Sequence, residues 1–171
     1  MTATSSTDRY ATAHVEKVEP AGLLVTRDFA AKPEVVWRAF TDPALIPRWM
    51  TGYPGWSMPV CEIDPRVGGT YRYEWREDAT GSSFGFFGEF REVVAPRRLV
   101  HQETFDPGTM GGDMGTSIVT TDFAPVAHGT RMTMRIDYDS RDTLQAALAT
   151  GMTDGMEQTY ASLDGVLSDL D

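Results

Sequence analysis

The sequence predicts one α+β domain, in which an antiparallel sheet is followed by a long C-terminal helix. Two patterns carry this prediction. Between residues 58 and 138, apolar and polar side chains alternate with period two in successive runs joined by short turns, as in an antiparallel meander. After residue 140, apolar residues recur at three- and four-residue steps, which is typical of an amphipathic helix. The length of 171 residues fits a single domain.

The chain is expected to begin with a disordered tail over residues 1–12, because this segment is rich in serine and threonine and has little to bury. Residues 13–171 are expected to form the domain. From residue 15 to Phe29 the chain looks extended, with every second residue from Leu23 to Phe29 on one face.

Two short helices are predicted next. Pro33 and Glu34 suit a first helical turn, where proline needs no hydrogen-bond donor and a carboxylate faces the positive end of the dipole. The Thr-Asp-Pro sequence at residues 41–43 ends this helix and caps the second. A loop rich in glycine and proline follows over residues 52–59.

The meander comes after this loop. Gly85 and Gly88 lie within one of its strands, where they indicate a bulge or a close approach of the backbone. The strands are predicted over residues 58–63, 70–76, 83–94, 99–105, 116–123 and 130–138.

The last segment returns to helical period. Ser140 or Asp142 can cap its start, and Gly151 and Gly155 indicate close packing or a kink. Its apolar stripe consists of Leu144, Leu148, Met152, Met156, Tyr160, Leu163, Leu167 and Leu170.

The net charge of −10 argues against a nucleic-acid or anionic membrane partner, because both need a basic surface. No apolar stretch is long enough to span a bilayer, and the N-terminus lacks the basic and apolar segments of a secretory signal. Cys61 is the single cysteine, which excludes an intramolecular disulfide and suits a reducing compartment. We therefore expect a cytoplasmic protein.

The sequence offers no established catalytic or metal motif. It has no G-x-S-x-G nucleophile elbow, and its three histidines are too far apart for metal-ligand spacing. Cys61 lies on a predicted strand between Val60 and Glu62, so we interpret it as an inert buried thiol. No cofactor is expected, and His14 and His128, in the tail and a turn, are not expected to act.

Several segments resemble a known family. They are VTRDFAAKPEVVWRAFTDPALIPRWM, DPRVGGTYRYEW, GEFREVVAPRRLVHQETF, GTRMTMRIDY and GMTDGMEQTYASLDGVL. In this order they resemble the START/Bet v 1-like superfamily, and within it the homologues of the activator of the heat-shock-protein-90 ATPase. The resemblance covers residues 24–167. It implies the helix-grip fold, in which a curved antiparallel sheet wraps around a long C-terminal helix and leaves a cavity between them.

The implied cavity selects the candidate ligand-binding residues. A curved sheet and one helix leave a gap unless large side chains fill it, and ligand sites are mostly apolar with a few polar groups. The candidates are Trp37, Phe40, Trp49, Trp56, Tyr71, Tyr73, Trp75, Phe87, Glu103, Phe105, Met132, Met134, Ile136, Tyr138, Met152, Met156 and Tyr160.

Two features of this set remain open at the level of sequence. By alternation Glu103 and His101 share a face with Phe105. The Glu103 carboxylate either orients a ligand hydroxyl or amine, pairs with an arginine, or lies on an outward face, and His101 is either a hydrogen-bonded structural residue or a base. Trp56, Met110 and Met114 form either a flexible mouth or ordinary surface loops.

Three functions are compatible with the sequence. The first is a binding protein for a small apolar or aromatic molecule. The second is an enzyme of the cyclase or dehydratase kind, with Glu103, His101 or a tyrosine as acid or base. The third is a protein-interaction module, either chaperone-related or forming a homodimer, which predicts a filled interior and an exposed apolar patch.

Overall fold

The computed structural model describes residues 9–109, 111 and 115–170. Within these residues, eight antiparallel strands form one sheet in the order β1-β2-β8-β7-β6-β5-β4-β3. The strands are β1 (His14–Val18), β2 (Gly22–Phe29), β3 (Trp56–Ile63), β4 (Thr70–Glu77), β5 (Ser83–Val94), β6 (Arg98–Asp106), β7 (Thr116–Val126) and β8 (Gly129–Tyr138). The predicted meander is thus β3 to β8, and the N-terminal hairpin joins it beside β8.

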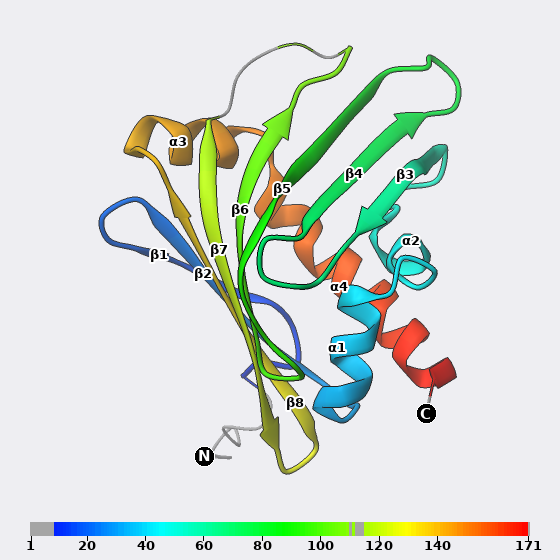
Figure 1. Ribbon diagram of the computed structural model, residues 1–171, viewed down its shortest axis with the longest axis vertical. Coiled ribbons are helices and arrows are strands. Elements are labelled where there is room, and N and C mark those ends of the chain that lie inside the picture. Colours follow the sequence, from blue (N-terminus) through cyan, green and yellow to red (C-terminus); the bar gives the residue numbers. More distant parts are fainter. Residues whose placement is uncertain (1–8, 110, 112–114, 171) are drawn as a thin grey trace, which may run out of the picture.

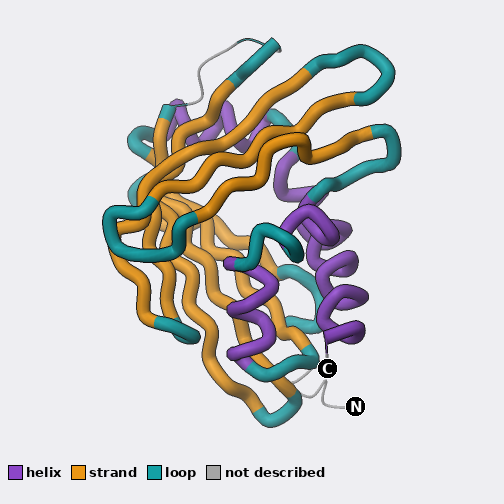
Figure 2. Tube along the Cα trace, turned by 45° about the vertical axis from the view of Figure 1, so that its right-hand side comes forward, coloured by secondary structure: helices purple, strands orange, loops and turns teal. Residues whose placement is uncertain are grey.

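Four helices accompany the sheet in the described part of the chain: α1 (Pro33–Thr41), α2 (Ile46–Met50), α3 (Arg141–Ala149) and α4 (Met152–Leu170). Figure 1 shows α4 running behind the strands, with α1 in front of its C-terminal half. Figure 2 shows the sheet curving around the helices, as the helix-grip fold requires. Among the described helices, none combines the length and the apolar character that crossing a bilayer demands.

The C-terminal helical segment is divided in two. Sequence periodicity predicts one continuous helix, but the chain turns at Gly151, whose φ of 77° lies in the left-handed region that favours glycine. The hydroxyl of Ser140 accepts a hydrogen bond from the backbone N–H of Thr143 and so caps α3, as expected. The long helix α4 therefore begins at Met152.

Of the tail expected over residues 1–12, residues 1–8 lie outside the part of the chain that the structure describes. From Arg9 onward the chain is held against the sheet. The backbone N–H of Asp28 donates to the carbonyl of Tyr10 at 2.8 Å, and the guanidinium of Arg131 lies 4.5 Å from the centroid of the Tyr10 ring.

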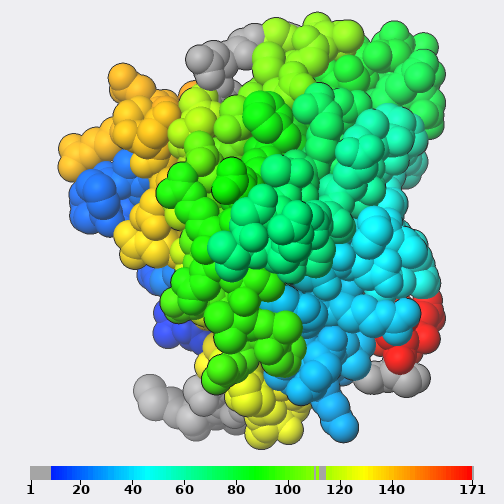
Figure 3. Space-filling model, in the orientation of Figure 1, coloured from blue at the N-terminus to red at the C-terminus, as the bar shows by residue number. Residues whose placement is uncertain are grey.

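The register of the strands decides which side chains face α4. Leu23, Val25, Arg27 and Phe29 share this inner face, because each is paired with an inward residue of β8. Figure 3, in the orientation of Figure 1, shows the strands together with α1 and α2 covering most of α4. The close approach of the backbone expected at Gly88 is confirmed, because a Cβ atom at this position would collide with the backbone oxygen of Gln102.

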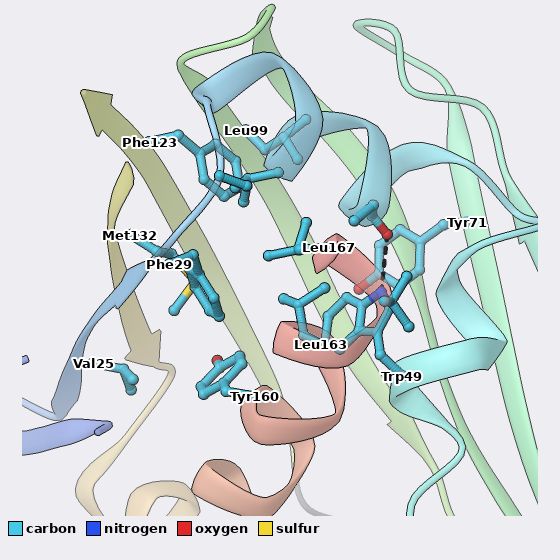
Figure 4. Close-up of a cluster of buried hydrophobic side chains, with 14 of the residues drawn as sticks. Val25, Phe29, Trp49, Tyr71, Leu99, Phe123, Met132, Tyr160, Leu163 and Leu167 are labelled. Carbon is cyan, nitrogen blue, oxygen red and sulfur yellow. Dashed lines mark hydrogen bonds between the residues drawn. The ribbon is translucent and has the colours of Figure 1, made fainter. Parts of the chain in front are cut away.

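The core is packed tightly around the C-terminal half of α4. Figure 4 shows Leu163 and Leu167 of this helix lying between Phe29 of β2 on one side and Trp49 of α2 on the other. The indole N–H of Trp49 donates to the backbone oxygen of Ala39 at 3.0 Å, which ties α2 to α1. This end of the domain is a closed core.

A buried arginine fastens α4 to the sheet. The Arg27 side chain is 3% exposed, and its guanidinium lies 2.6 Å from Glu157 and 2.7 Å from Asp164, both on α4. Burial by itself lowers the pKa of Arg27, but the hydrogen bonds and charges of the two carboxylates outweigh burial and raise the pKa overall. The ion cluster therefore fixes how α4 crosses the inner face.

Candidate ligand-binding groove

On β6 and α4, inward side chains are less buried toward the end of the domain where α4 begins, although Trp75 of β4 and Ser117 of β7 are buried at that end as well. On β6, Leu99 is 5% exposed, whereas the side chains of His101 and Glu103 are 17% and 28% exposed. Along α4, Tyr160 is buried but Met156 and Met152 are half-buried. Solvent thus reaches inward-facing side chains at the end of the domain where α4 begins.

We use the name groove for the set of half-buried inward side chains at this end of the domain. Strand pairing places them on β4, β5, β6 and β8, and α4 supplies the facing wall. The groove residues are Tyr73, Phe84, Phe86, His101, Glu103, Phe105, Met134, Tyr138, Met152 and Met156.

Aromatic rings form most of the sheet side of the groove. Phe86 and Phe105 are opposite each other on neighbouring strands, with ring centroids 5.4 Å apart. Phe84 stacks on Trp75 at 5.3 Å and 12°. The Trp75 indole donates to the backbone oxygen of Met50 at 2.9 Å, so it is anchored to α2. The result is a fixed apolar surface with favourable aromatic geometry.

A polar cluster lies beside these rings. The hydroxyl of Tyr71 donates to Oε2 of Glu103 at 3.3 Å, and Nε2 of His101 lies 3.3 Å from the same oxygen. Nδ1 of His101 is buried and has no hydrogen-bond partner among the described residues. Nε2 of His101 can therefore donate a hydrogen bond to this carboxylate oxygen.

Three tyrosine hydroxyls respond to this carboxylate. Burial raises the pKa of Tyr71, Tyr73 and Tyr138, and the negative charge of Glu103 raises each pKa further. The pKa of Tyr138 rises to about 12. All three hydroxyls therefore stay protonated near neutral pH. The Tyr138 hydroxyl already donates to the sulfur of Met152 at 3.4 Å, a weak acceptor.

The structure brings several predicted site residues together in the groove and places others nearby. Tyr71 and Trp75 lie at its buried margin, with exposures of 4% and 9%. Trp56 is the first residue of β3 and packs edge-on against Phe84 at 5.7 Å. The predicted residues within the groove are Tyr73, Glu103, Phe105, Met134, Tyr138, Met152 and Met156. Met110 and Met114, expected at a mouth, lie outside the described residues.

Other predicted site residues belong to the packed interior instead. The rings of Trp37 and Phe40 pack against Phe123 at 6.0 and 5.1 Å, and Tyr160 packs against Phe29 at 5.8 Å. Helices α1 and α2 fill the space that these rings were expected to leave open. Trp49, Met132, Ile136 and Tyr160 are buried in this way, and Trp37 and Phe40 are half-buried against the same core.

The prediction that Phe87 faces the interior as a ligand-binding residue is wrong, because Phe87 lies on the outer face of the sheet. It pairs with Arg72, while its neighbour Phe86 pairs with Tyr73 and faces inward. Phe87 is 39% exposed, and the Arg72 guanidinium lies 5.7 Å from its ring centroid. It lines a shallow outer depression of about 470 Å³ together with Glu62, Thr70, Gln102 and Thr104. Phe87 is therefore excluded from the groove.

Sequence reasoning missed Phe84, Phe86 and Ser117. Phe84, Phe86 and Phe90 are separated by even numbers of residues, which is the signal in the sequence that they share a face. Ser117 is a buried polar residue opposite Glu103 on β7, and alternation from Val119 places it inward. Cys61 faces Tyr73 across β3 and β4, and burial raises its thiol pKa to about 11, as an unreactive thiol requires.

Comparison with known proteins identifies similar chains. Residues 30–168 match the family described as "Activator of Hsp90 ATPase homolog 1-like protein". A crystal structure of a Rhodobacter sphaeroides protein is 33% identical, covers 92% of this chain and 99% of its own, and has a TM-score of 0.83. A solution structure of an Arthrobacter aurescens protein is 27% identical over 91% of both chains, with a TM-score of 0.78.

A Mycobacterium smegmatis protein shares the fold at 24% identity, covering 91% of this chain and 96% of its own, with a TM-score of 0.79. No functionally curated protein matches the sequence.

Proposed function

Since the chain belongs to the family of activator of Hsp90 ATPase homolog 1-like proteins and has their helix-grip fold, we propose that it binds a small, largely apolar or aromatic molecule in the groove. The observation that carries this proposal is the solvent access to inward-facing rings at one end of an otherwise closed core. A bound ligand would remove the exposed parts of rings such as Phe86 and Phe105 from water, and this burial of apolar surface stabilises the complex.

The direct test is native mass spectrometry of the protein as purified. We expect a retained small molecule, or else a rise in melting temperature when apolar aromatic compounds are screened. A ligand at a hundred times its dissociation constant stabilises the folded state by about 2.7 kcal/mol. A protein that retains nothing, and whose melting temperature does not rise with any aromatic compound, would contradict the proposal.

Two adjacent phenylalanines provide a matched pair of variants. Phe86→Ala removes a ring from the groove, and we expect it to weaken the binding of an aromatic ligand by about tenfold, equivalent to about 1.4 kcal/mol. Phe87→Ala removes the same ring from the outer face and is expected to leave affinity unchanged. Isothermal titration calorimetry on both variants, with thermal melting as the check on folding, measures the difference. Equal losses in the two variants would place the site elsewhere.

A further inference from the structure

Glu103 has one carboxylate oxygen committed to the protein and one free to meet a ligand. Oε2 accepts from the Tyr71 hydroxyl and contacts Nε2 of His101, both at 3.3 Å. Oε1 receives no hydrogen bond from any described residue, although the side chain is only 28% exposed. Oε1 is therefore an acceptor that the described residues leave unused and that is accessible to water or to a ligand.

The negative charge of Glu103 also lacks a counter-charge. Across the described ranges, no lysine or arginine pairs with it, and its charged-group contact is with His101. The buried cation of the inner face, Arg27, is already bound by Glu157 and Asp164. Burial is the main cause of the raised pKa of Tyr71, Tyr73 and Tyr138, and the nearby Glu103 carboxylate adds to it. A cation in the groove would balance the charge of Glu103.

The rings around Glu103 favour the same kind of ligand. Tyr71 lies 5.1 Å from Tyr73 between ring centroids, and Phe86 and Phe105 continue the surface along β5 and β6. Aromatic faces attract cations, most strongly where water is partly excluded. A carboxylate among such rings recognises an organic cation by charge and the apolar remainder of the molecule by contact.

We propose that the ligand of the groove is an organic cation, such as a protonated amine, whose charged group lies at Oε1 of Glu103 while its apolar or aromatic body lies along Phe86 and Phe105. This inference rests on the proposed function and specifies the ligand class for the same site. It also predicts that anionic compounds of the same shape are excluded, because they would meet an uncompensated carboxylate.

Three probes with a common ring system test the charge requirement: naphthylethylammonium, naphthylethanol and naphthylpropanoate. We expect calorimetry on the full chain to show the ammonium binding at least about tenfold more tightly than the alcohol, and the carboxylate binding most weakly. If the alcohol binds as tightly as the ammonium, the cation inference fails while the proposed groove stands. If none of the three binds, both proposals fail.

Two variants locate the source of the preference. Glu103→Gln keeps the shape of the side chain and removes its charge, so the ammonium and the alcohol should then bind about equally. Glu89→Gln removes the same charge from the exposed outer face of the adjacent strand and controls for general attraction to a protein of net charge −10. A preference for the ammonium that survives Glu103→Gln would overturn the assignment. The probe series on the unaltered protein decides the charge requirement even if a variant fails to fold.

Discussion

At the scale of single residues, the position of a charge decides what it contributes. Arg27 is buried and binds two carboxylates of α4, whereas Arg98 forms the same kind of pair with Asp122 on the exposed outer face. Removing one member of a buried ion pair leaves the remaining charges unpaired and poorly solvated. When one member of an exposed pair is removed, water solvates the charge that remains. Arg27 therefore contributes more to the free energy of unfolding than Arg98, although their hydrogen-bond distances are similar.

We expect Arg27→Met to lower the free energy of unfolding by about 2–4 kcal/mol, because Glu157 and Asp164 lose their shared partner yet retain partial contact with water. Arg98→Met should cost at most about 1 kcal/mol. Urea unfolding of both variants measures the difference. Similar losses in the two variants would mean that the Arg27 cluster does not hold α4.

At the scale of secondary-structure elements, the sequence predicts best where the pattern is unambiguous. Alternation in β4 identifies Tyr71, Tyr73 and Trp75 as inward, and the same reasoning on β6 identifies Glu103. It fails on β5, where Phe86 and Phe87 are adjacent and two nearby glycines obscure which phenylalanine shares the inner face. The even spacing of Phe84, Phe86 and Phe90 favours Phe86, and pairing with β4, a tertiary contact, resolves the choice.

The same limit applies to where cavities lie. The aromatic content predicts large inward side chains, but which of them pack together depends on where α1 and α2 sit. Trp37 and Phe40 are brought onto Phe123 by that placement, and no local pattern in the sequence specifies it. The composition of the inner face was therefore predictable, and its division into core and groove was not.

Two glycines in the C-terminal segment should respond to alanine in opposite ways. Gly151→Ala forces a side chain into a conformation with φ of 77° and is expected to destabilise the protein by about 1–2 kcal/mol. Gly165→Ala, within α4 and with open space around its Cβ position, should stabilise it by about 0.5–1 kcal/mol. Thermal and urea unfolding report both signs. Stabilisation by Gly151→Ala would show that the break between α3 and α4 is not required.

At the scale of the whole molecule, the domain has a closed end and an open end. The closed end is held by Phe29, Phe123, Leu163 and other side chains that exclude solvent. The open end exposes part of the inner face around Glu103. The packed core and the proposed binding site therefore lie at different ends of one sheet, and we expect substitutions in the groove to leave the protein folded.

Hydrogen exchange should follow this division. We expect the backbone amides around Phe123 and Met132 to exchange most slowly, and those around Phe84 and Phe105, at the open end of the same sheet, to exchange faster. A bound ligand should slow exchange at the open end in particular. Uniform protection along β5 and β6, with and without ligand, would contradict the two-ended description.

The place of β2 beside β8 has a consequence for how the domain is made. Leu23 pairs with Ile136, and Arg27 meets Glu157 at a separation of 130 positions. During synthesis, the N-terminal hairpin emerges long before either partner and must wait with its apolar face uncovered. The sheet can reach its full width, and α4 can be fastened across it, only after α4 has left the ribosome. Folding of this domain therefore waits for the emergence of its last helix.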